Sequence, residues 1–160
     1  MDKEIQYRAL GHYTEGLLKK YSNDRELTKY MFTGIFPNSP FEIKDSDVVF
    51  DIVENLSPLD HYGVVGLFNI NWQARHAELR IFLWSKQGEG IGTDACKFIV
   101  DYAFNMLNLN KVWLGVNAEH EQAKACYHKA GFKDIGILRS EIFRNGKYYD
   151  VARMECIQQG

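Results

Sequence analysis

The chain has 160 residues, which fits one domain with a substantial core, and its 46% hydrophobic and 25% charged residues match an ordinary globular protein. The formal net charge of -2 argues against nucleic acid or an anionic membrane as a partner. No apolar stretch reaches the length of a membrane span, and the N-terminal residues carry no signal stretch. The three cysteines, Cys96, Cys126 and Cys156, form no Cys-x-x-Cys pair, so we expect a cytoplasmic protein without a disulfide framework.

The N-terminal part of the sequence predicts one strand and two short helices. Residues 5–9 alternate apolar and polar side chains, which is typical of a strand. Residues 14–20 and 24–31 are predicted as helices, with Asn23 as the N-cap of the second and Glu26 three residues beyond it.

Residues 39–56 allow either a helix or a strand. Ser39 and Glu42 have the spacing of a capping box, with Pro40 at the first helical position. The β-branched run over 48–53 favours a strand instead. We favour a short turn of helix followed by a strand.

From residue 63 onward the predicted order is clearer. Segments 63–72 and 77–84 predict an antiparallel pair of strands, and apolar residues at helical spacing predict a helix over 91–106. The remaining elements are a strand over 111–116, a helix with Ala123, Cys126, Tyr127 and Ala130 on one face and Gly131 at its end, and strands over 133–143 and 147–157 around an Asn145-Gly146 hairpin turn. No repeat or linker interrupts them, so we predict a single domain over residues 1–160.

Three glycines, Gly88, Gly90 and Gly92, lie between a predicted strand and the helix that begins near Ile91. Residues without a Cβ let the backbone approach a ligand and adopt positive φ. The N–H groups at the start of the next helix form a site for an anion. This turn therefore predicts a pyrophosphate-binding loop, although a glycine-rich turn without a ligand remains an open alternative.

Two common nucleotide-binding motifs do not fit this turn. A Rossmann fingerprint needs a third glycine where Thr93 stands, and it would follow the first strand of a parallel unit rather than an antiparallel pair. A Walker loop needs Gly-Lys-Ser/Thr, which is absent. The pattern Gln87-x-x-Gly90-x-Gly92 does fit the coenzyme A loop of the GNAT acetyltransferases.

From about residue 62 to residue 154 the chain resembles the GNAT branch that contains the ribosomal-protein N-terminal acetyltransferases and related small-amine acetylases. The resemblance rests on several motifs in the family's order: His76-Ala77-Glu78-Leu79-Arg80-Ile81-Phe82-Leu83 for the fourth strand, Gly90-Ile91-Gly92-Thr93-Asp94-Ala95 for the coenzyme A loop, Leu109-Asn110-Lys111-Val112 for the fifth strand, Tyr127-His128-Lys129-Ala130-Gly131-Phe132 for the Tyr-x-Lys-x-Gly-Phe signature, and Lys147-Tyr148-Tyr149-Asp150 for the last hairpin. The first sixty residues, where the family keeps its acceptor specificity, match only loosely.

The resemblance implies an α/β layered GNAT fold, with a central, mostly antiparallel mixed sheet of about seven strands and helices on both faces. It also favours a strand over residues 48–53. The implied acyl donor is acetyl-CoA. Its expected contacts are Ile81, Phe82 and Leu83 on the fourth strand, Gln87, Gly88, Glu89, Gly90, Ile91, Gly92 and Thr93 at the glycine turn, and His120 and Lys124 near the following helix.

Acyl transfer from a thioester needs a neutral amine, a stabilised oxyanion and a proton for the departing thiolate. The resemblance places Tyr127 beside the coenzyme A sulfur as the general acid, with a core aromatic as the alternative interpretation. Glu78 is the candidate base, acting directly or through water. A strand carboxylate paired with Arg80 or His76 is the alternative for Glu78.

Some features depart from the family pattern or carry less information. The connection from Leu83 to Gln87 is one residue shorter than usual and lacks a proline, and His120 stands where the family has Asn. Two histidines eight residues apart, His120 and His128, cannot share one ion, so no metal site is expected. Cys126 has no obvious His partner and is interpreted as a small buried residue.

The leading hypothesis is an N-acetyltransferase that acts on a primary amine by direct attack in a ternary complex. The acceptor is left open among a protein N-terminus, a polyamine or antibiotic-like amine, and an amino sugar. A non-catalytic acetyl-CoA-binding sensor or scaffold is the alternative. The oligomeric state is also open, with a homodimer as one option.

Overall fold

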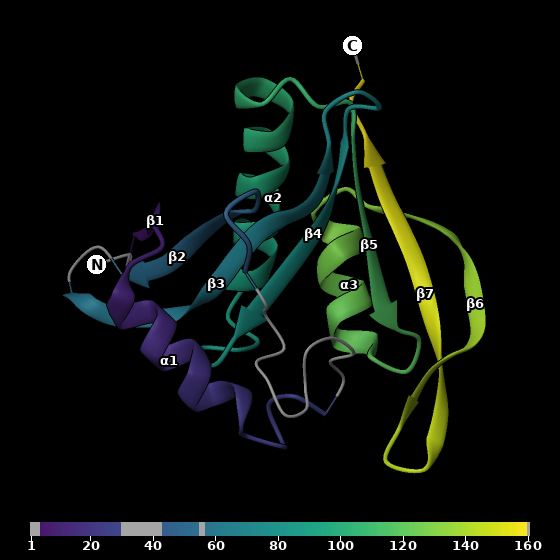
Figure 1. Ribbon diagram of the computed structural model, residues 1–160, viewed down its shortest axis with the longest axis horizontal. Coiled ribbons are helices and arrows are strands. Elements are labelled where there is room, and N and C mark those ends of the chain that lie inside the picture. Colours follow the sequence, from purple (N-terminus) through teal and green to yellow (C-terminus); the bar gives the residue numbers. More distant parts are fainter. Residues whose placement is uncertain (1–3, 30–42, 55–56, 160) are drawn as a thin grey trace.

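A computed structural model describes residues 4–29, 43–54 and 57–159, arranged around one twisted sheet (Figure 1). Within these described residues the sheet has seven strands in the order β1-β2-β3-β4-β5-β7-β6, and β4 and β5 are the one parallel pair among them. The strands are β1 (Ile5–Ala9), β2 (Val48–Glu54), β3 (Ser57–Asn71), β4 (His76–Leu83), β5 (Lys111–Asn117), β6 (Lys133–Arg144) and β7 (Lys147–Ile157). The predicted mixed, mostly antiparallel sheet is therefore confirmed.

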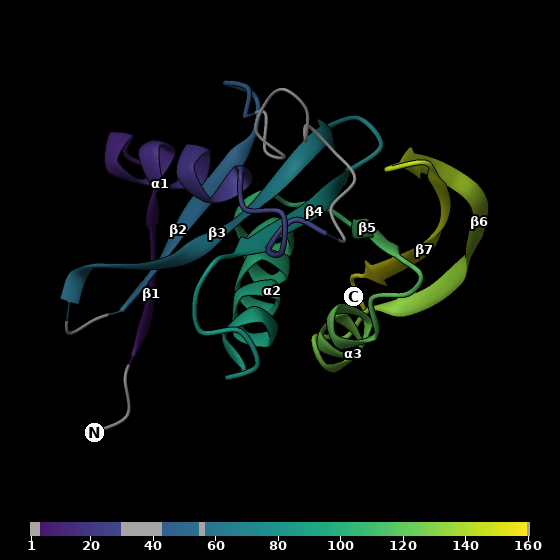
Figure 2. The same ribbon diagram turned by 90° about the horizontal axis from the view of Figure 1, so that it is seen from below.

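Helices cover both faces of this sheet. Figure 2 shows α1 (His12–Ser22) on one face, and α2 (Ile91–Asp101) and α3 (Glu121–Lys129) on the other. The larger hydrophobic core lies on the α2/α3 face, and a smaller one around Leu18, Phe68 and Phe82 lies under α1. Among the described residues, no helix is long and apolar enough to cross a membrane.

The segment after α1 differs from the prediction. Asn23 ends α1, because its backbone N–H donates to the Lys20 carbonyl. The Asp24 carboxylate then accepts the N–H groups of Glu26 and Leu27 at 3.0 and 3.2 Å. These bonds hold residues 25–29 in a turn, so the helix predicted from residue 24 was wrong for the described part of that segment. Residues 30–31 and the Ser39–Glu42 capping box lie outside the described residues.

The ambiguous stretch is a strand from Val48 onward, preceded by a turn at residues 45–46. Strand β2 pairs antiparallel with β3, and β3 pairs antiparallel with β4 through a turn at residues 72–75. The β-branched side chains that favoured a strand pack on both faces, which accounts for the outcome.

The helix predicted over 91–106 forms in two parts. Helix α2 is followed by a π-helical turn, η1 (Tyr102–Met106), in which the Leu107 N–H donates to the carbonyl of Tyr102, five residues earlier. The amphipathic pattern predicted the whole length but not the change in hydrogen bonding.

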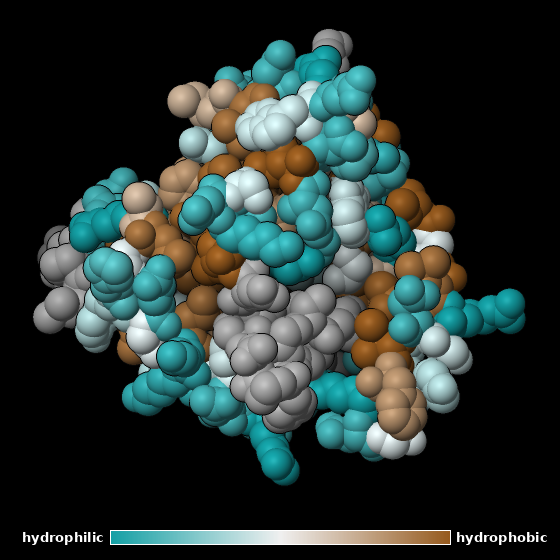
Figure 3. Space-filling view, viewed as in Figure 1, coloured by the Kyte–Doolittle hydropathy of each residue, from teal (hydrophilic) through white to brown (hydrophobic). Residues whose placement is uncertain are grey.

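The last elements follow the prediction closely. Gly131 ends α3 with a left-handed φ of 103°, and Asn145 and Gly146 have φ of 52° and 75°, as a type I′ turn requires. Exposed apolar side chains gather on the right of the molecule, where β6 and β7 lie (Figure 3), and include Ile137, Leu138 and Phe143.

Candidate active site

Strands β4 and β5 are paired at one end and separate at the other. Their ladder contains only His76, Ala77 and Glu78 of β4, opposite Lys111, Val112 and Trp113 of β5. Among the described strands, β4 beyond Glu78 pairs with β3 alone, and β5 there pairs with β7 alone. Residues 79–83 therefore present an unpaired backbone edge toward the gap, which suits the addition of an extended ligand. The sequence did not predict where the pairing stops.

The glycine turn lies at the end of the open edge. Gly88 and Gly90 have φ of 80° and 83°, a left-handed conformation that glycine adopts without strain. Gly90 is the N-cap of α2, and no side chain caps this helix end. Residues 86–90 are exposed, so the first N–H groups of α2 are accessible to an anion.

The neighbours of the turn show that Gln87, Gly88 and Gly92 have different roles. The Gln87 side chain donates to the Leu83 carbonyl at 2.7 Å and ties the turn back to β4. A Cβ on Gly92 would lie 3.3 Å from the Cys126 sulfur, so this glycine allows α2 and α3 to pack closely. Gln122 at the start of α3 reaches the turn, because its Nε2 lies 3.7 Å from the position of a Cβ on Gly88. The sequence carried no signal for Gln122.

Tyr127 lies on the side of α3 that packs against the larger core. Its ring contacts Phe132 edge-on, with ring centroids 6.1 Å apart. Burial raises the pKa of the Tyr127 phenol well above its ordinary value, and the nearby thiols of Cys96 and Cys126 act in the same direction. The phenol is therefore protonated at neutral pH, as a general acid must be. Its catalytic role stays a prediction.

Glu78 lies on the opposite face of the sheet from Tyr127. It is directly across the ladder from Phe68, which belongs to the core under α1, and directly opposed residues share a face. Arg80 donates to Oε1 of Glu78 through Nε at 2.7 Å, and Asn69 donates to Oε2 at 3.1 Å. The pairing with Arg80 that the sequence left open is present. The role of Glu78 as the base stays a prediction.

The two remaining candidates lie around the start of α3. His120 is the N-cap residue, and burial, followed by the charge of Lys29, lowers the pKa of its imidazole. Lys124 donates to the Ala118 carbonyl and pairs with Glu121, each at 2.8 Å. Contacts of both residues with coenzyme A stay predictions.

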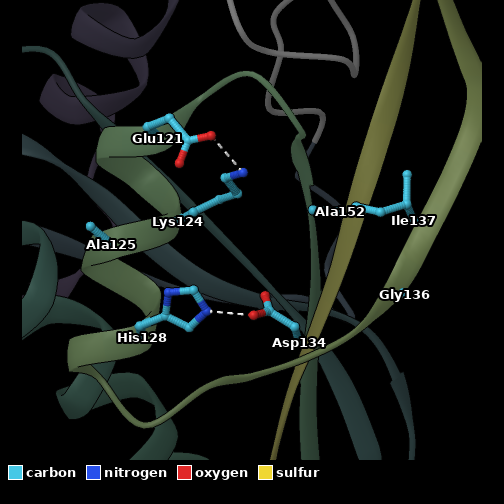
Figure 4. Close-up of a pocket in the computed structure, with 8 residues that line it drawn as sticks. All are labelled: Glu121, Lys124, Ala125, His128, Asp134, Gly136, Ile137 and Ala152. Atoms are coloured by element: carbon cyan, nitrogen blue, oxygen red, sulfur yellow. Dashed lines mark hydrogen bonds and ion pairs between the residues drawn. The ribbon is translucent and has the colours of Figure 1, made fainter.

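Lys124 also lines a groove of about 350 Å³ between α3 and the β6–β7 hairpin (Figure 4). The figure shows Lys124 directed toward Glu121, and His128 directed toward Asp134 at 2.9 Å. Neither Tyr127 nor the glycine turn lines this groove, and both Lys124 and His128 in it already contact an acidic side chain. We therefore place the candidate active site at the gap between β4 and β5. Within the described residues, no group of acidic, His and Cys side chains could hold a metal.

An open β4 edge, a left-handed glycine turn at a helix start and a half-buried tyrosine on the next helix are together the features expected of an acyl-CoA-dependent transferase. Residues 6–133 match the acetyltransferase (GNAT) domain family, so the chain belongs to that family. It is an N-acetyltransferase that moves an acetyl group from acetyl-CoA to a primary amine.

Several relatives share more than the family. The chain is 31% identical to the spermidine N(1)-acetyltransferase of Vibrio cholerae over 99% of its own length and 95% of that protein. It is 44% identical to the Escherichia coli strain K12 spermidine N(1)-acetyltransferase, over 61% of this chain and 52% of that protein. It also superposes on the Vibrio cholerae spermidine N-acetyltransferase in complex with CoA and spermine, with a TM-score of 0.84 and 28% identity over 96% of this chain and 95% of that one.

The residues of this chain fit acetyl-CoA on their own geometry. The edge of residues 79–83, which pairs with no described strand on the β5 side, would offer backbone groups to the pantetheine amides, and the glycine turn would offer N–H groups to the pyrophosphate. Any other L residue at position 90 would have to adopt the left-handed backbone conformation that Gly90 has, which is strained when a Cβ is present. The local conformation therefore already suits a phosphate-binding loop.

Proposed function

We propose that this chain acetylates a primary amine of a polyamine of the spermidine class. The observation that carries the proposal is the likeness to spermidine N(1)-acetyltransferases over nearly the whole chain. A match of one short motif would not distinguish acceptors. The alignment to the Vibrio cholerae relative covers 99% of this chain, so it includes the N-terminal region where acceptor specificity is expected.

The face of the sheet under α1 supports a cationic acceptor. Glu78 of β4, Trp113 of β5 and Glu155 of β7 are directly opposed in neighbouring ladders and share this face. Strands lie about 4.8 Å apart, so the two glutamates start about 10 Å apart with an indole between them. This row already attracts cations, because Arg80 pairs with Glu78 and the Arg153 guanidinium lies 3.7 Å from the centre of the Trp113 ring. We expect an ammonium group of the acceptor to take the place of one of these guanidinium groups.

The proposed chemistry uses both faces of the sheet. The amine enters from the α1 face, where Glu78 removes its proton directly or through a water. The thioester lies on the α2/α3 side, where the protonated Tyr127 phenol gives a proton to the departing thiolate. The gap between β4 and β5 joins the two faces, and holding both reactants there removes the entropy cost of their encounter.

Acetyl-CoA turnover with a panel of amines tests this function. Thiol release should be fastest with spermidine or spermine and slower with an N-terminal peptide or an amino sugar. Faster turnover of either of those acceptors would contradict the polyamine proposal. Binding of acetyl-CoA without turnover on any amine would favour the sensor or scaffold instead.

The Tyr127→Phe variant tests the proposed acid. It removes only the hydroxyl, so we expect kcat to fall by about 10²–10⁴-fold with the KM for acetyl-CoA little changed. Tyr148→Phe is the matched control, because Tyr148 is 63% exposed on the hairpin. Unchanged kcat in Tyr127→Phe would remove the assignment. For Glu78→Gln we expect a loss of kcat that is partly recovered at higher pH, where more of the amine is already neutral.

The cytoplasm is the proposed location, and the three free cysteines support a reducing setting.

A further inference from the structure

Two cysteines, Cys96 and Cys126, lie where α2 packs against α3 near the glycine turn. Cys96 is in the second turn of α2 and fully buried, whereas Cys126 is in α3, one residue before Tyr127, and only half-buried. The sequence interpretation of Cys126 as a simple buried residue is therefore incomplete. Both cysteines belong to the contact between α2 and α3 in the larger core.

Three neighbours hold the Cys126 sulfur beside the glycine turn. The Thr93 hydroxyl donates to it at 3.4 Å, and Cys96, which follows Thr93 by about one helical turn, belongs to the cluster against which Cys126 packs. The third neighbour is the backbone of Gly92, since a Cβ there would lie 3.3 Å from this sulfur. Thr93 and Cys96 are three residues apart on α2, so they meet Cys126 from the same helix face.

We propose that Cys126 is a site of oxidative modification and that Cys96 is its resolving thiol, so that a disulfide between α2 and α3 controls the coenzyme A site. The inference rests on the placement of the donor at the glycine turn and is independent of which amine is the acceptor.

The chemistry balances with hydrogen peroxide as the oxidant. The Cys126 thiolate attacks one peroxide oxygen and the O–O bond breaks. Hydroxide leaves and takes up a proton to become water, and Cys126 becomes a sulfenic acid. The Cys96 sulfur then attacks the Cys126 sulfur and loses its proton, and the S–O bond breaks to release a second water. Two thiols are oxidised by two electrons, and the peroxide is reduced to two waters.

These steps need Cys126 to be the more reactive thiol and Cys96 to react second. The neighbouring Cys96 thiol, supported by the Thr93 hydroxyl and the charge of Lys129, lowers the pKa of Cys126 to about 6 despite its burial. The Cys126 thiol and burial raise the pKa of Cys96. A lowered pKa leaves more of the Cys126 thiol as the reactive thiolate at neutral pH than in a free cysteine.

Closing the disulfide would change the glycine turn. The Cys126 sulfur must move toward Cys96 to form a bond of about 2.05 Å, which breaks its hydrogen bond with Thr93. Because that sulfur also contacts the Gly92 backbone, the start of α2 shifts relative to α3. Coenzyme A binding should therefore weaken in the oxidised protein, and bound acetyl-CoA should shield Cys126.

The test is titration of the full chain with hydrogen peroxide, followed by intact mass, peptide mapping and calorimetric binding of CoA. We expect two of the three thiols to be lost with a mass decrease of two hydrogens, a peptide cross-linked between residues 96 and 126, and CoA binding weakened by about tenfold or more and restored by dithiothreitol. Prior addition of acetyl-CoA should slow the reaction.

Cys156→Ser is the matched control and should oxidise like the parent chain, because burial raises the pKa of the Cys156 thiol and it lies on β7. Cys96→Ala should instead stop at a sulfenic acid on Cys126. Peptide mapping of the unaltered chain decides the question if that variant does not fold. A cross-link that contains Cys156, equal reactivity of all three thiols, or unchanged CoA binding after oxidation would overturn the proposal.

Discussion

The two faces of the sheet differ in what holds them together. On the α2/α3 face, where the donor site lies, contacts are made by apolar residues, cysteines and glycines that allow close approach. On the α1 face, polar groups are buried with the apolar ones, including Thr14 and Asp51. Arg153 stacks on Trp113 at 3.7 Å, and Arg144 donates to the Thr28 carbonyl.

This difference follows what each face has to recognise. Acetyl-CoA is the donor, and a tightly packed site made mostly of backbone groups would suit it. An acceptor is selected by charge and shape, and a face with many charged side chains can change by substitution without loss of the sheet. The predictions below test whether the donor side depends on backbone geometry and the acceptor side on polar side chains.

The largest effect is expected at Gly63 in β3. A Cβ there would meet the Phe82 carbonyl oxygen well inside contact distance and also lie 2.9 Å from the Leu83 Cα, both backbone atoms of β4. Gly63→Ala should destabilise the fold by more than about 3 kcal/mol in chemical denaturation, because the strand that offers its edge to the cofactor must move. Gly16→Ala in α1 is the control, since nothing lies within 4 Å of its Cβ position. A mild effect at Gly63 would mean that β4 is less constrained than its packing indicates.

The next effect concerns the polar contacts under α1. The Thr14 hydroxyl donates to Oδ2 of Asp51 at 2.6 Å, and His61 Nδ1 lies 3.3 Å from that hydroxyl. Thr14→Val keeps the shape but leaves a buried carboxylate without its donor, so we expect a loss of about 1–3 kcal/mol in urea unfolding. Thr14→Ser keeps the hydroxyl and should cost less. A greater cost for the serine variant would assign the stability to the methyl group.

A smaller effect is expected at Gly90, where the donor side depends on a left-handed backbone. Gly90→Ala should cost about 1–2 kcal/mol of strain in the folded state and raise the KM for acetyl-CoA. Gly90→Asn should be milder, because asparagine tolerates this conformation better. Equal KM values for wild type and the alanine variant would argue against a phosphate-binding role for the turn.

The smallest effect is a change in pH dependence at Asp51. Burial raises the pKa of this carboxyl, against the opposing effects of Thr14, His61 and Arg8. The folded protein therefore holds this proton more tightly than the unfolded chain, whose carboxyl has a pKa of about 3.9. The stability contributed by the protonated group is complete below that pH and is lost as the pH rises through the folded-state pKa.

Asp51→Asn removes this titration. As the pH rises from about 4, the unfolding free energy of wild type should therefore fall relative to that of the variant. A difference that grows in favour of wild type over the same range would show that the ionised carboxylate stabilises the fold.

The sequence predicted the regular elements of the second half of the chain well, because local patterns determine them. Gly131 and Asn145-Gly146 were correctly assigned to left-handed positions, for which few residue types are suited. The stretch from residue 24 was less predictable, since one carboxylate, Asp24, bonds two backbone N–H groups and favours a turn over a helix.

Side-chain partnerships were harder to predict than elements. Glu78 and Arg80 are two residues apart on one strand face, so their contact could be anticipated and was. The Tyr7 hydroxyl bonds to Asp94, and Thr14 bonds to Asp51, over separations of 87 and 37 residues. No local pattern carries such information, because these contacts depend on how the sheet is ordered.

The sequence by itself predicted the candidate donor site in outline: a glycine turn at a helix start, followed by Tyr127 on the next helix. These features are local, since positive φ, helix ends and helical spacing are properties of neighbouring residues. Only the tertiary structure decided that β4 and β5 part after Glu78, that Glu78 and Tyr127 lie on opposite faces of the sheet, and that Cys96, Thr93 and Cys126 meet beside the turn. Strand pairing and helix packing bring together residues that are distant in sequence, and the energy of those contacts depends on the whole fold.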